Sequence, residues 1–326
     1  MLMNMWYEEI RKEETEMHMI LEILLLAVGF VLLVKGADWF VDGAAGIARK
    51  FHIPQLVIGL TIVAMGTSAP EAAVSISAAL KGSADITIGN IVGSNILNIL
   101  IILGLASVIV PIAVAKATIK VDMPFMMFIT VVLLLLGWDG TVSLGDGLIM
   151  AGLFIAYIAH LLYDAKKHPD TADIEFIREL SLPKSLMWTV VGLALIILGS
   201  DFAVDAATEI ARILGLSERF IGLTIVALGT SLPELFTSVM AARKGNADIA
   251  IGNIVGSNIF NILFVVGLSS LIIPVPFAQA FRIDTLVALG AGLLLWLCSL
   301  RGKLQRWHGA VMLLAYGGYF AYLLLK

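Results

Sequence analysis

The chain has 326 residues, of which 60% are hydrophobic and 14% are charged, and its formal net charge is −4. Soluble domains are about 45–50% apolar and about 25% charged, so this composition excludes an ordinary soluble protein and predicts an integral membrane protein. The single cysteine, Cys298, excludes a disulfide scaffold, and the lack of a basic patch excludes a nucleic-acid-binding protein.

Long uncharged stretches locate the membrane-spanning segments, and the two longest cover residues 86–115 and 249–281. A spanning helix needs about 20 mostly apolar residues, so several shorter stretches become full spans only by admitting a charge such as Glu71 or Glu234. The predicted fold class is an all-α integral membrane protein with ten transmembrane helices. These are expected at residues 20–48, 53–80, 86–109, 118–138, 143–164, 185–212, 218–242, 248–272, 280–299 and 304–325.

The predicted organisation has two five-helix halves, 19–164 and 185–326, joined by a short cytoplasmic linker, 165–184. Residues 1–18 form an acidic tail whose first part is not basic, so they are not expected to be a signal peptide. Met1 and Met19 are equally good candidates for the start of translation.

The distribution of Lys and Arg predicts the orientation in the membrane. One set of loops holds thirteen of these residues and the other set, with the N-terminal tail, holds seven. Cytoplasmic loops are enriched in Lys and Arg. We therefore expect a multi-pass protein of the inner (plasma) membrane with both termini on the extracytoplasmic side.

The central part of the chain is duplicated. Residues 59–105 and 222–268 align without a gap at an offset of 163, and 33 of 47 positions are identical. Five predicted spans separate each element from its copy, and because five is odd the second half must insert upside down. Inverted-topology repeats of this kind place substrate sites near the bilayer midplane, between the repeats.

Each copy carries a helix-breaking motif in the middle of a span: GTSAPE at 66–71 and GTSLPE at 229–234. Proline removes a backbone N–H, which frees the carbonyl of Gly66 or Gly229. At membrane depth a free carbonyl is tolerated only where another group satisfies it or where it lines a cavity. Thr67 and Glu71, four residues apart, predict a stripe of oxygen atoms beside the break, and the second copy repeats it.

The span after each break supplies a second polar stripe at a spacing of four residues: Asn90, Ser94 and Asn98, and in the copy Asn253, Ser257 and Asn261. The predicted site is therefore built from oxygen atoms alone, which suits Ca²⁺ better than zinc or copper. Two carboxylates give it a charge of −2, which one Ca²⁺ or two Na⁺ would neutralise. Since an empty site of this charge is costly in the membrane, we expect obligatory exchange rather than a leak.

The other aspartates in or beside the spans are expected to have roles other than binding the ion. Asp38, Asp42, Asp201 and Asp205 lie towards the ends of the first and sixth spans and are expected to make capping or gating contacts. Asp85 and Asp248 open the third and eighth spans, where a carboxylate complements a helix N-terminus.

The two long motifs, GTSAPE with GNIVGSNILN and GTSLPE with GNIVGSNIFN, resemble the alpha-repeats of the calcium/cation antiporter superfamily, in particular prokaryotic sodium/calcium exchangers. The resemblance covers residues 24–268. It implies ten helices in which helices 2, 3, 7 and 8 bind ions while helices 1 and 6 slide across them. It also implies electrogenic exchange of about three Na⁺ for one Ca²⁺, with no cofactor and no obligatory protein partner.

The ligands implied by the resemblance are Thr67, Ser68, Glu71, Ser94, Asn98, Thr230, Ser231, Glu234, Ser257 and Asn261, with the main-chain carbonyls of Ala64 and Ala227. Potassium-dependent members carry an aspartate where Asn261 stands, which weakens the case for potassium co-transport. Proton-coupled members typically carry asparagine where Thr67 and Thr230 stand, which favours sodium coupling.

Three alternatives stay open at this point. Glu71 and Glu234 could carry protons in a Ca²⁺/H⁺ exchanger, because buried carboxylates bind protons more readily. A passive cation channel would conduct without a counter-ion. An intramembrane enzyme is disfavoured, since the duplicated core has no nucleophile–base pair.

Overall fold

The computed structural model describes residues 2–82, 84–167, 180–215 and 227–325, and almost all of them are helical. Among the described residues, seven helical stretches are long and apolar enough to cross a membrane. A bent pair, Gln55–Thr67 and Ala69–Leu80, forms an eighth candidate span. The five helices that run without interruption are α1 (Leu2–Phe51), α8 (Leu144–Lys167), α9 (Leu182–Ile213), α15 (Gln279–Ser299) and α16 (Arg306–Leu325).

The remaining predicted spans are divided into shorter helical segments. These are α2 (Gln55–Ile58), η1 (Gly59–Val63), α3 (Ala64–Thr67) and α4 (Ala69–Leu80); α5 (Asp85–Leu97), η2 (Asn98–Leu103) and α6 (Gly104–Ile109); η3 (Thr118–Asp122), α7 (Met123–Leu136) and η4 (Gly137–Asp139); α11 (Ala227–Gly229) and α12 (Leu232–Arg243); and α13 (Ala247–Phe260), η6 (Asn261–Val266) and α14 (Gly267–Ile272).

Helices occupy all the predicted positions that the structure describes, with one difference at the N-terminal end. The first helix continues back to Leu2, so the tail expected at residues 1–18 extends α1 rather than preceding it. The first part of the span expected at 218–242, and most of the linker expected at 165–184, lie outside the described residues.

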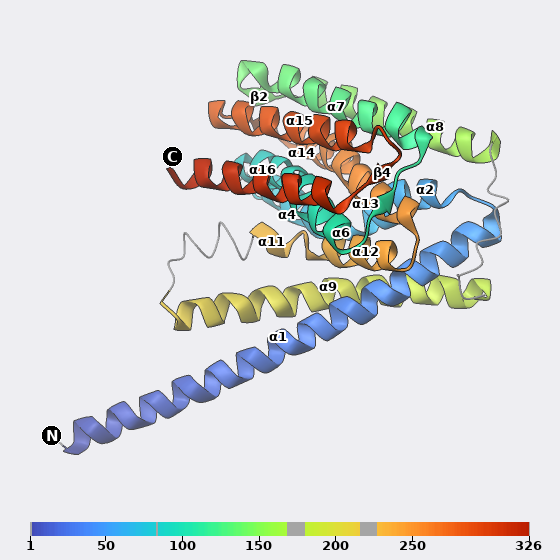
Figure 1. The fold of residues 1–326 in the computed structure, drawn as a ribbon. Coiled ribbons are helices and arrows are strands. Elements are labelled where there is room, and N and C mark those ends of the chain that lie inside the picture. The colour runs from blue at the N-terminus through green and yellow to red at the C-terminus, as the bar shows by residue number, and fades with distance from the viewer. Residues whose placement is uncertain (1, 83, 168–179, 216–226, 326) are drawn as a thin grey trace.

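The helices form two groups around a central layer (Figure 1). Helices α1 and α9 run side by side in opposite directions along one side of the molecule, and α7, α8 and α15 lie on the opposite side. Helices α4, α5, α12 and α13 lie between them. The N- and C-termini lie at the same end of the molecule in this view. Residues 249–260 of α13 are all buried, including the polar residues Asn253 and Ser257, so this helix lies at the centre of the molecule.

Helices α1 and α9 approach each other closely because glycines line both surfaces. A Cβ atom added to Gly36 would lie 2.8 Å from the carbonyl oxygen of Gly192, and one added to Gly192 would lie 2.5 Å from the backbone nitrogen of Phe40. The Trp39 and Trp188 rings stack beside this contact, with their centroids 5.9 Å apart. Small residues at a membrane helix contact let the backbones meet without interlocking side chains.

Short strand pairs connect the two halves of the chain. Strand β1 (Ile112–Ala113) pairs antiparallel with β4 (Lys303–Leu304), and β2 (Thr141–Val142) pairs antiparallel with β3 (Val275–Pro276). Each pair therefore joins a loop of the first half to a loop of the second half.

A matching pair of hydrogen bonds extends the duplication beyond the region where the sequences align. The Tyr157 hydroxyl bonds to Asp122 at 3.2 Å, and the Tyr319 hydroxyl bonds to Asp284 at 3.0 Å. Each residue lies 162 positions from its equivalent, one fewer than the offset of the central motifs. The duplicated unit thus includes the helices that follow the central motifs.

Candidate functional site

The two helix breaks lie where the motifs predicted them. Helix α3 ends at Thr67 and α4 begins at Ala69, with a bend of 51° between the two parts of the span. Ser68 forms the corner, with φ −82° and ψ 8°, and Ser231 forms the equivalent corner with φ −93° and ψ 3°. Each break creates a helix N-terminus inside the span and places a glutamate in its first turn, where the helix dipole favours negative charge.

The carbonyl of Gly229, which the second proline leaves without a helical donor, accepts a hydrogen bond from a side chain. The Ser200 hydroxyl of α9 donates a hydrogen bond to the carbonyl oxygen of Gly229 at 2.8 Å. This is the substitute partner that a broken backbone needs at membrane depth. The residue equivalent to Ser200 in the first half is Ala37, which has no hydroxyl to donate.

Glu71 and Glu234 are almost completely buried, with 1% and 0% of their surfaces exposed. The serine of each break binds the acid of the other break. The Ser68 hydroxyl donates to Oε1 of Glu234 at 2.7 Å, and the Ser231 hydroxyl donates to Oε1 of Glu71 at 3.3 Å. These crossed hydrogen bonds link each glutamate to the break that carries the other, so both carboxylates belong to one buried cluster.

Asparagines at the start of the second stripe hold the glutamate helices in place. Nδ2 of Asn90 donates to the Ser75 hydroxyl at 3.0 Å and to the carbonyl oxygen of Glu71 at 3.3 Å. Nδ2 of Asn253 makes the equivalent bonds to Ser238 and Glu234, at 2.9 Å and 3.3 Å. In each asparagine, the side-chain amide nitrogen therefore donates two hydrogen bonds to a single glutamate-bearing helix.

A pair of asparagines that the sequence interpretation did not single out joins α5 to α13. Nδ2 of Asn95 donates to the carbonyl oxygen of Asn258 at 3.2 Å, and Nδ2 of Asn258 donates to that of Asn95 at 3.1 Å. Both lie in the duplicated GSN sequence, so their recurrence at the offset of 163 was the signal available. Because a carbonyl oxygen only accepts, these bonds fix which end of each amide faces the next residue.

The orientation passes on to Asn98 and Asn261. Nδ2 of Asn98 donates to Oδ1 of Asn258 at 2.9 Å, and Nδ2 of Asn261 donates to Oδ1 of Asn95 at 3.1 Å. Both amide nitrogens are thus used, and both side-chain oxygens are left over. Asn98 and Asn261 also begin the π-helical segments η2 and η6, a distortion that frequently marks functional sites.

Four of the buried oxygen atoms in this part of the structure have no hydrogen-bond partner: Oε2 of Glu71, Oε2 of Glu234, Oδ1 of Asn98 and Oδ1 of Asn261. They are two symmetric pairs at the offset of 163. Helix α4 packs against η6 and α12 against η2, so each glutamate helix faces the asparagine segment of the other half. Leaving a buried acceptor unpaired costs about 1–3 kcal/mol, and a bound cation removes that cost.

The remaining expected ligands lie around this group. Ser94 and Ser257 are buried, and the Ser257 hydroxyl donates to the Ala64 carbonyl oxygen at 3.4 Å. Thr67 donates to Oδ1 of Asn253 at 2.9 Å, and Thr230 lies beside the Glu71 carboxylate. Ala227 opens α11 directly after residues 216–226, which lie outside the described residues, and the role expected for its carbonyl stays a prediction.

The four aspartates of α1 and α9 have other surroundings. Asp38 and Asp42 pair with Lys244, and Asp201 and Asp205 line a cavity between α4 and α9. Across the described ranges, three or more His, Cys, Asp or Glu side chains do not gather anywhere in a way that could hold a metal ion. Within the described residues, the candidate site for a cation is therefore the pair of glutamates with neutral oxygen atoms around them.

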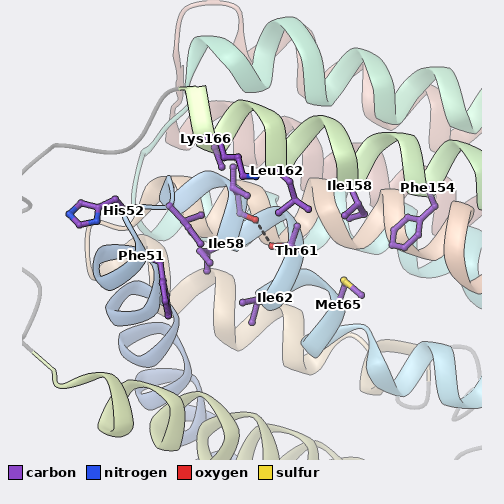
Figure 2. Close-up of a pocket in the computed structure, with 13 residues that line it drawn as sticks. Phe51, His52, Ile58, Thr61, Ile62, Met65, Phe154, Ile158, Leu162 and Lys166 are labelled. Carbon is purple, nitrogen blue, oxygen red and sulfur yellow. Dashed lines mark hydrogen bonds between the residues drawn. The ribbon is translucent and has the colours of Figure 1, made fainter.

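A separate cavity of about 710 Å³ lies between the η1 region and α8, as Figure 2 shows. Its walls are mostly apolar, with Ile58, Ile62 and Met65 on one side and Phe154 and Ile158 on the other. Its one hydroxyl, that of Thr61, is already bonded to the carbonyl of Val57 at 2.6 Å. This cavity lacks the oxygen atoms of a cation site.

Residues 21–163 and 184–325 match the family described as sodium/calcium exchanger protein. The chain belongs to this family. Its members are transporters rather than enzymes, and this exchanger is a multi-pass membrane protein.

Relatives of nearly equal length support the assignment. CaxA from Alkalimonas amylolytica is 44% identical over 92% of this chain and 98% of its own. The sodium/calcium exchanger MaX1 from Methanosarcina acetivorans is 33% identical over 90% of this chain and 95% of its own. A solved structure of the sodium-calcium exchanger NCX_Mj superimposes with a TM-score of 0.81 at 36% identity, covering 93% of this chain and 99% of that one.

Proposed function

We propose that this exchanger moves Ca²⁺ out of the cell in exchange for Na⁺, binding both ions in turn at the oxygen cluster between the two helix breaks. The observation that carries the proposal is the set of four buried, unpartnered oxygens on Glu71, Glu234, Asn98 and Asn261. Carboxylate and amide oxygens are the ligands that hard cations prefer, and Ca²⁺ takes about 6–8 of them. The further ligands in this proposal are Thr67, Ser68, Ser94, Thr230, Ser231 and Ser257, with the carbonyls of Ala64 and Ala227.

The architecture belonging to this function has ten transmembrane helices in two inverted five-helix repeats, 19–164 and 185–326, with both termini outside. The gap-free internal duplication and the matched Asp–Tyr hydrogen bonds support it. The common end at which both termini lie supports an even number of spans (Figure 1). The E. coli relative named inner membrane protein YrbG, 38% identical, supports the inner membrane as the location.

The hydroxyls beside the acids support sodium rather than proton coupling. Thr67 and Thr230 add neutral oxygens that a sodium ion can use and that a proton on Glu71 or Glu234 does not need. The relative MaX1 is named a sodium/calcium exchanger, which supports the same choice. The alternative, a Ca²⁺/H⁺ exchanger, uses the same two glutamates as proton carriers.

The deciding experiment is uptake of radioactive calcium by proteoliposomes that hold the purified chain. Vesicles loaded with Na⁺ and diluted into Na⁺-free buffer, with any pH gradient collapsed by a protonophore, are expected to accumulate Ca²⁺. Vesicles without a sodium gradient but with a pH gradient are expected to take up only the background amount. Uptake that follows the pH gradient instead would establish the proton-coupled alternative, and uptake without either gradient would establish a channel.

A further inference from the structure

Two lysines occupy equivalent positions at the ends of the glutamate-bearing helices. Lys81 follows α4 and Lys244 follows α12, and 163 residues separate them, as they separate all the duplicated motifs. Each helix is 12 residues long, with its glutamate in the first turn and its lysine just past the last. At 1.5 Å per residue, each lysine therefore lies roughly 15 Å along the helix from its glutamate.

Lys244 ties the end of α12 to α1. Its Nζ lies 2.5 Å from Oδ1 of Asp42 and 2.8 Å from Oδ1 of Asp38, and it donates to the Asp38 carbonyl oxygen at 2.8 Å. The side chains of Lys244 and Asp42 are only 22% and 17% exposed. All three donor positions of the ammonium group are used on α1. We call Lys244, Asp38 and Asp42 the α1–α12 clamp.

The equivalent group in the other half is open. Asp201 and Asp205 of α9 are the equivalents of Asp38 and Asp42, and both line a cavity of about 460 Å³ between α9 and α4. The same cavity is lined by Pro70 and Thr230, so it extends from these aspartates to both helix breaks. Lys81 is exposed and, within the part of the chain that the structure describes, forms no ion pair.

One half thus has a closed clamp, and the other has an open cavity leading towards the cation site. We propose that Lys244 and Lys81 are the gate residues of the exchange cycle. Lys244 holds α1 against α12 while the cavity at Asp201 and Asp205 is open. Lys81 makes the equivalent clamp with Asp201 and Asp205 when the opposite side opens.

Charge distinguishes the open half from the closed half. In the open half, two unpaired aspartates place negative charge in a narrow cavity, which raises the local concentration of cations at the path to the site. In the closed half, the lysine pairs with both aspartates and reduces their net charge from −2 to −1, which weakens that attraction. Because the ion pairs are partly buried, they are less screened by salt than pairs on the surface. Interfaces that switch between two such sets of pairs are a known form of two-state element.

The inference rests on the proposed alternating exchange, but its test does not depend on transport. Cys298 is replaced by Ala, and Ala73, an exposed residue that lines the open cavity, is changed to Cys as a reporter. The rate at which a bulky thiol reagent labels this reporter is measured on detergent-purified protein without Na⁺ or Ca²⁺. The compared proteins carry Lys244→Gln, Lys81→Gln or neither change.

Lys244→Gln removes the clamp that stabilises the conformation in which the cavity at Asp201 and Asp205 is open. Labelling of the reporter is therefore expected to slow by about fivefold or more, because the conformation with this cavity closed gains population. Lys81→Gln removes the opposing clamp, so labelling is expected to become faster than in the parent, and an unchanged rate would show that Lys81 has no part in the gate. Equal effects of the two variants, or no effect of Lys244→Gln, would overturn the proposal, because a merely structural tie has no reason to act with opposite sign.

Two further variants keep the result decisive. Asp42→Asn is expected to slow labelling as Lys244→Gln does, and it carries the test if Lys244→Gln fails to fold. The exchanged pair Asp42→Lys with Lys244→Asp is expected to restore labelling, and failure to restore it counts against the clamp. Sodium-driven calcium uptake is measured on the same preparations. A labelling shift without such uptake contradicts the proposed function alone, and uptake without a labelling shift contradicts the gate alone.

Discussion

The two glutamates are the residues on which the proposed cation site depends most directly. Each is buried, each has one oxygen bonded to the serine of the opposite break, and each has one oxygen left over. Their negative charge in the membrane interior is sustainable only with a compensating cation. A neutral amide of the same shape keeps the packing and removes the charge.

We therefore expect Glu71→Gln and Glu234→Gln each to lower sodium-driven calcium uptake at least about a hundredfold, since a full ligand charge is lost. Uptake per amount of reconstituted protein is the measurement. Glu22→Gln is the matched control, because Glu22 is also buried but lies on α1 beside His18. Near-normal uptake by either site variant would refute the site.

The asparagine pair Asn95 and Asn258 acts on the site through its neighbours. Each fixes the amide of Asn98 or Asn261 so that the oxygen, not the nitrogen, is free. Residues that orient a metal ligand typically change affinity by about 10–100-fold when they are lost.

Replacing Asn258 by Ala is expected to raise the calcium concentration for half-maximal uptake by about tenfold while the maximal rate changes little. Ser299→Ala, which removes a buried hydroxyl that bonds only within α15, is expected to leave that concentration unchanged. Equal effects of the two substitutions would show that Asn258 has no orienting role.

For individual residues, the internal duplication of the sequence determined which parts of the candidate site could be predicted. Glu71 and Glu234 could be placed together because a charged residue repeated in mid-span has few structural explanations. Asn95 and Asn258 were not singled out, since one amide in an apolar helix is typical of ordinary helix–helix hydrogen bonding. The partnership of Lys244 with Asp42 joins residues 202 positions apart, and nothing in the local sequence indicates it.

At the scale of the element, the contact between α1 and α9 requires glycine. A Cβ atom on Gly192 would meet the backbone of Phe40 at 2.5 Å, and backbone atoms cannot turn aside as a flexible side chain can. Overpacking of this kind typically costs about 1–3 kcal/mol.

Gly192→Ala should consequently lower the thermal unfolding midpoint of the purified protein, through a loss of about 1–3 kcal/mol. Gly152→Ala provides the control, because a Cβ on Gly152 of α8 meets no described atom within 4 Å. Unchanged melting of the Gly192 variant would mean that the two helices are not held at the observed separation.

The helices themselves followed from hydropathy, but their interruptions followed only in part. The proline motifs located both breaks, whereas the 51° bend and the π-helical segments at Asn98 and Asn261 depend on how neighbouring helices pack. The continuation of α1 to Leu2 was also missed, because the acidic composition there lacks the apolar run by which spans were recognised.

For the whole molecule, the number of ions exchanged determines whether transport moves charge. With about three Na⁺ for one Ca²⁺, one positive charge leaves a vesicle for each Ca²⁺ that enters it, and each charge crossing 100 mV is worth about 2.3 kcal/mol. A site with a charge of −2 that bound two Na⁺ would move no net charge.

Calcium uptake driven by internal Na⁺ is accordingly expected to speed up when the vesicle interior is held positive and to slow down when it is held negative. Potassium gradients with valinomycin set the potential, and initial uptake rates give the result. Rates that do not change with the potential would establish electroneutral exchange of about two Na⁺ for one Ca²⁺, in place of the three that the family resemblance implies.

The two halves are similar but not identical, and Ser200 is a difference that changes the hydrogen bonding of the backbone at one helix break. Its hydroxyl supports the carbonyl of Gly229, while Ala37 leaves the corresponding group of the first half without such help. Matching halves would make the inward-facing and outward-facing forms equal in free energy. If the proposed exchange cycle runs through two such forms, a hydroxyl that supports one break and not the other is expected to make their free energies, and therefore their populations, unequal.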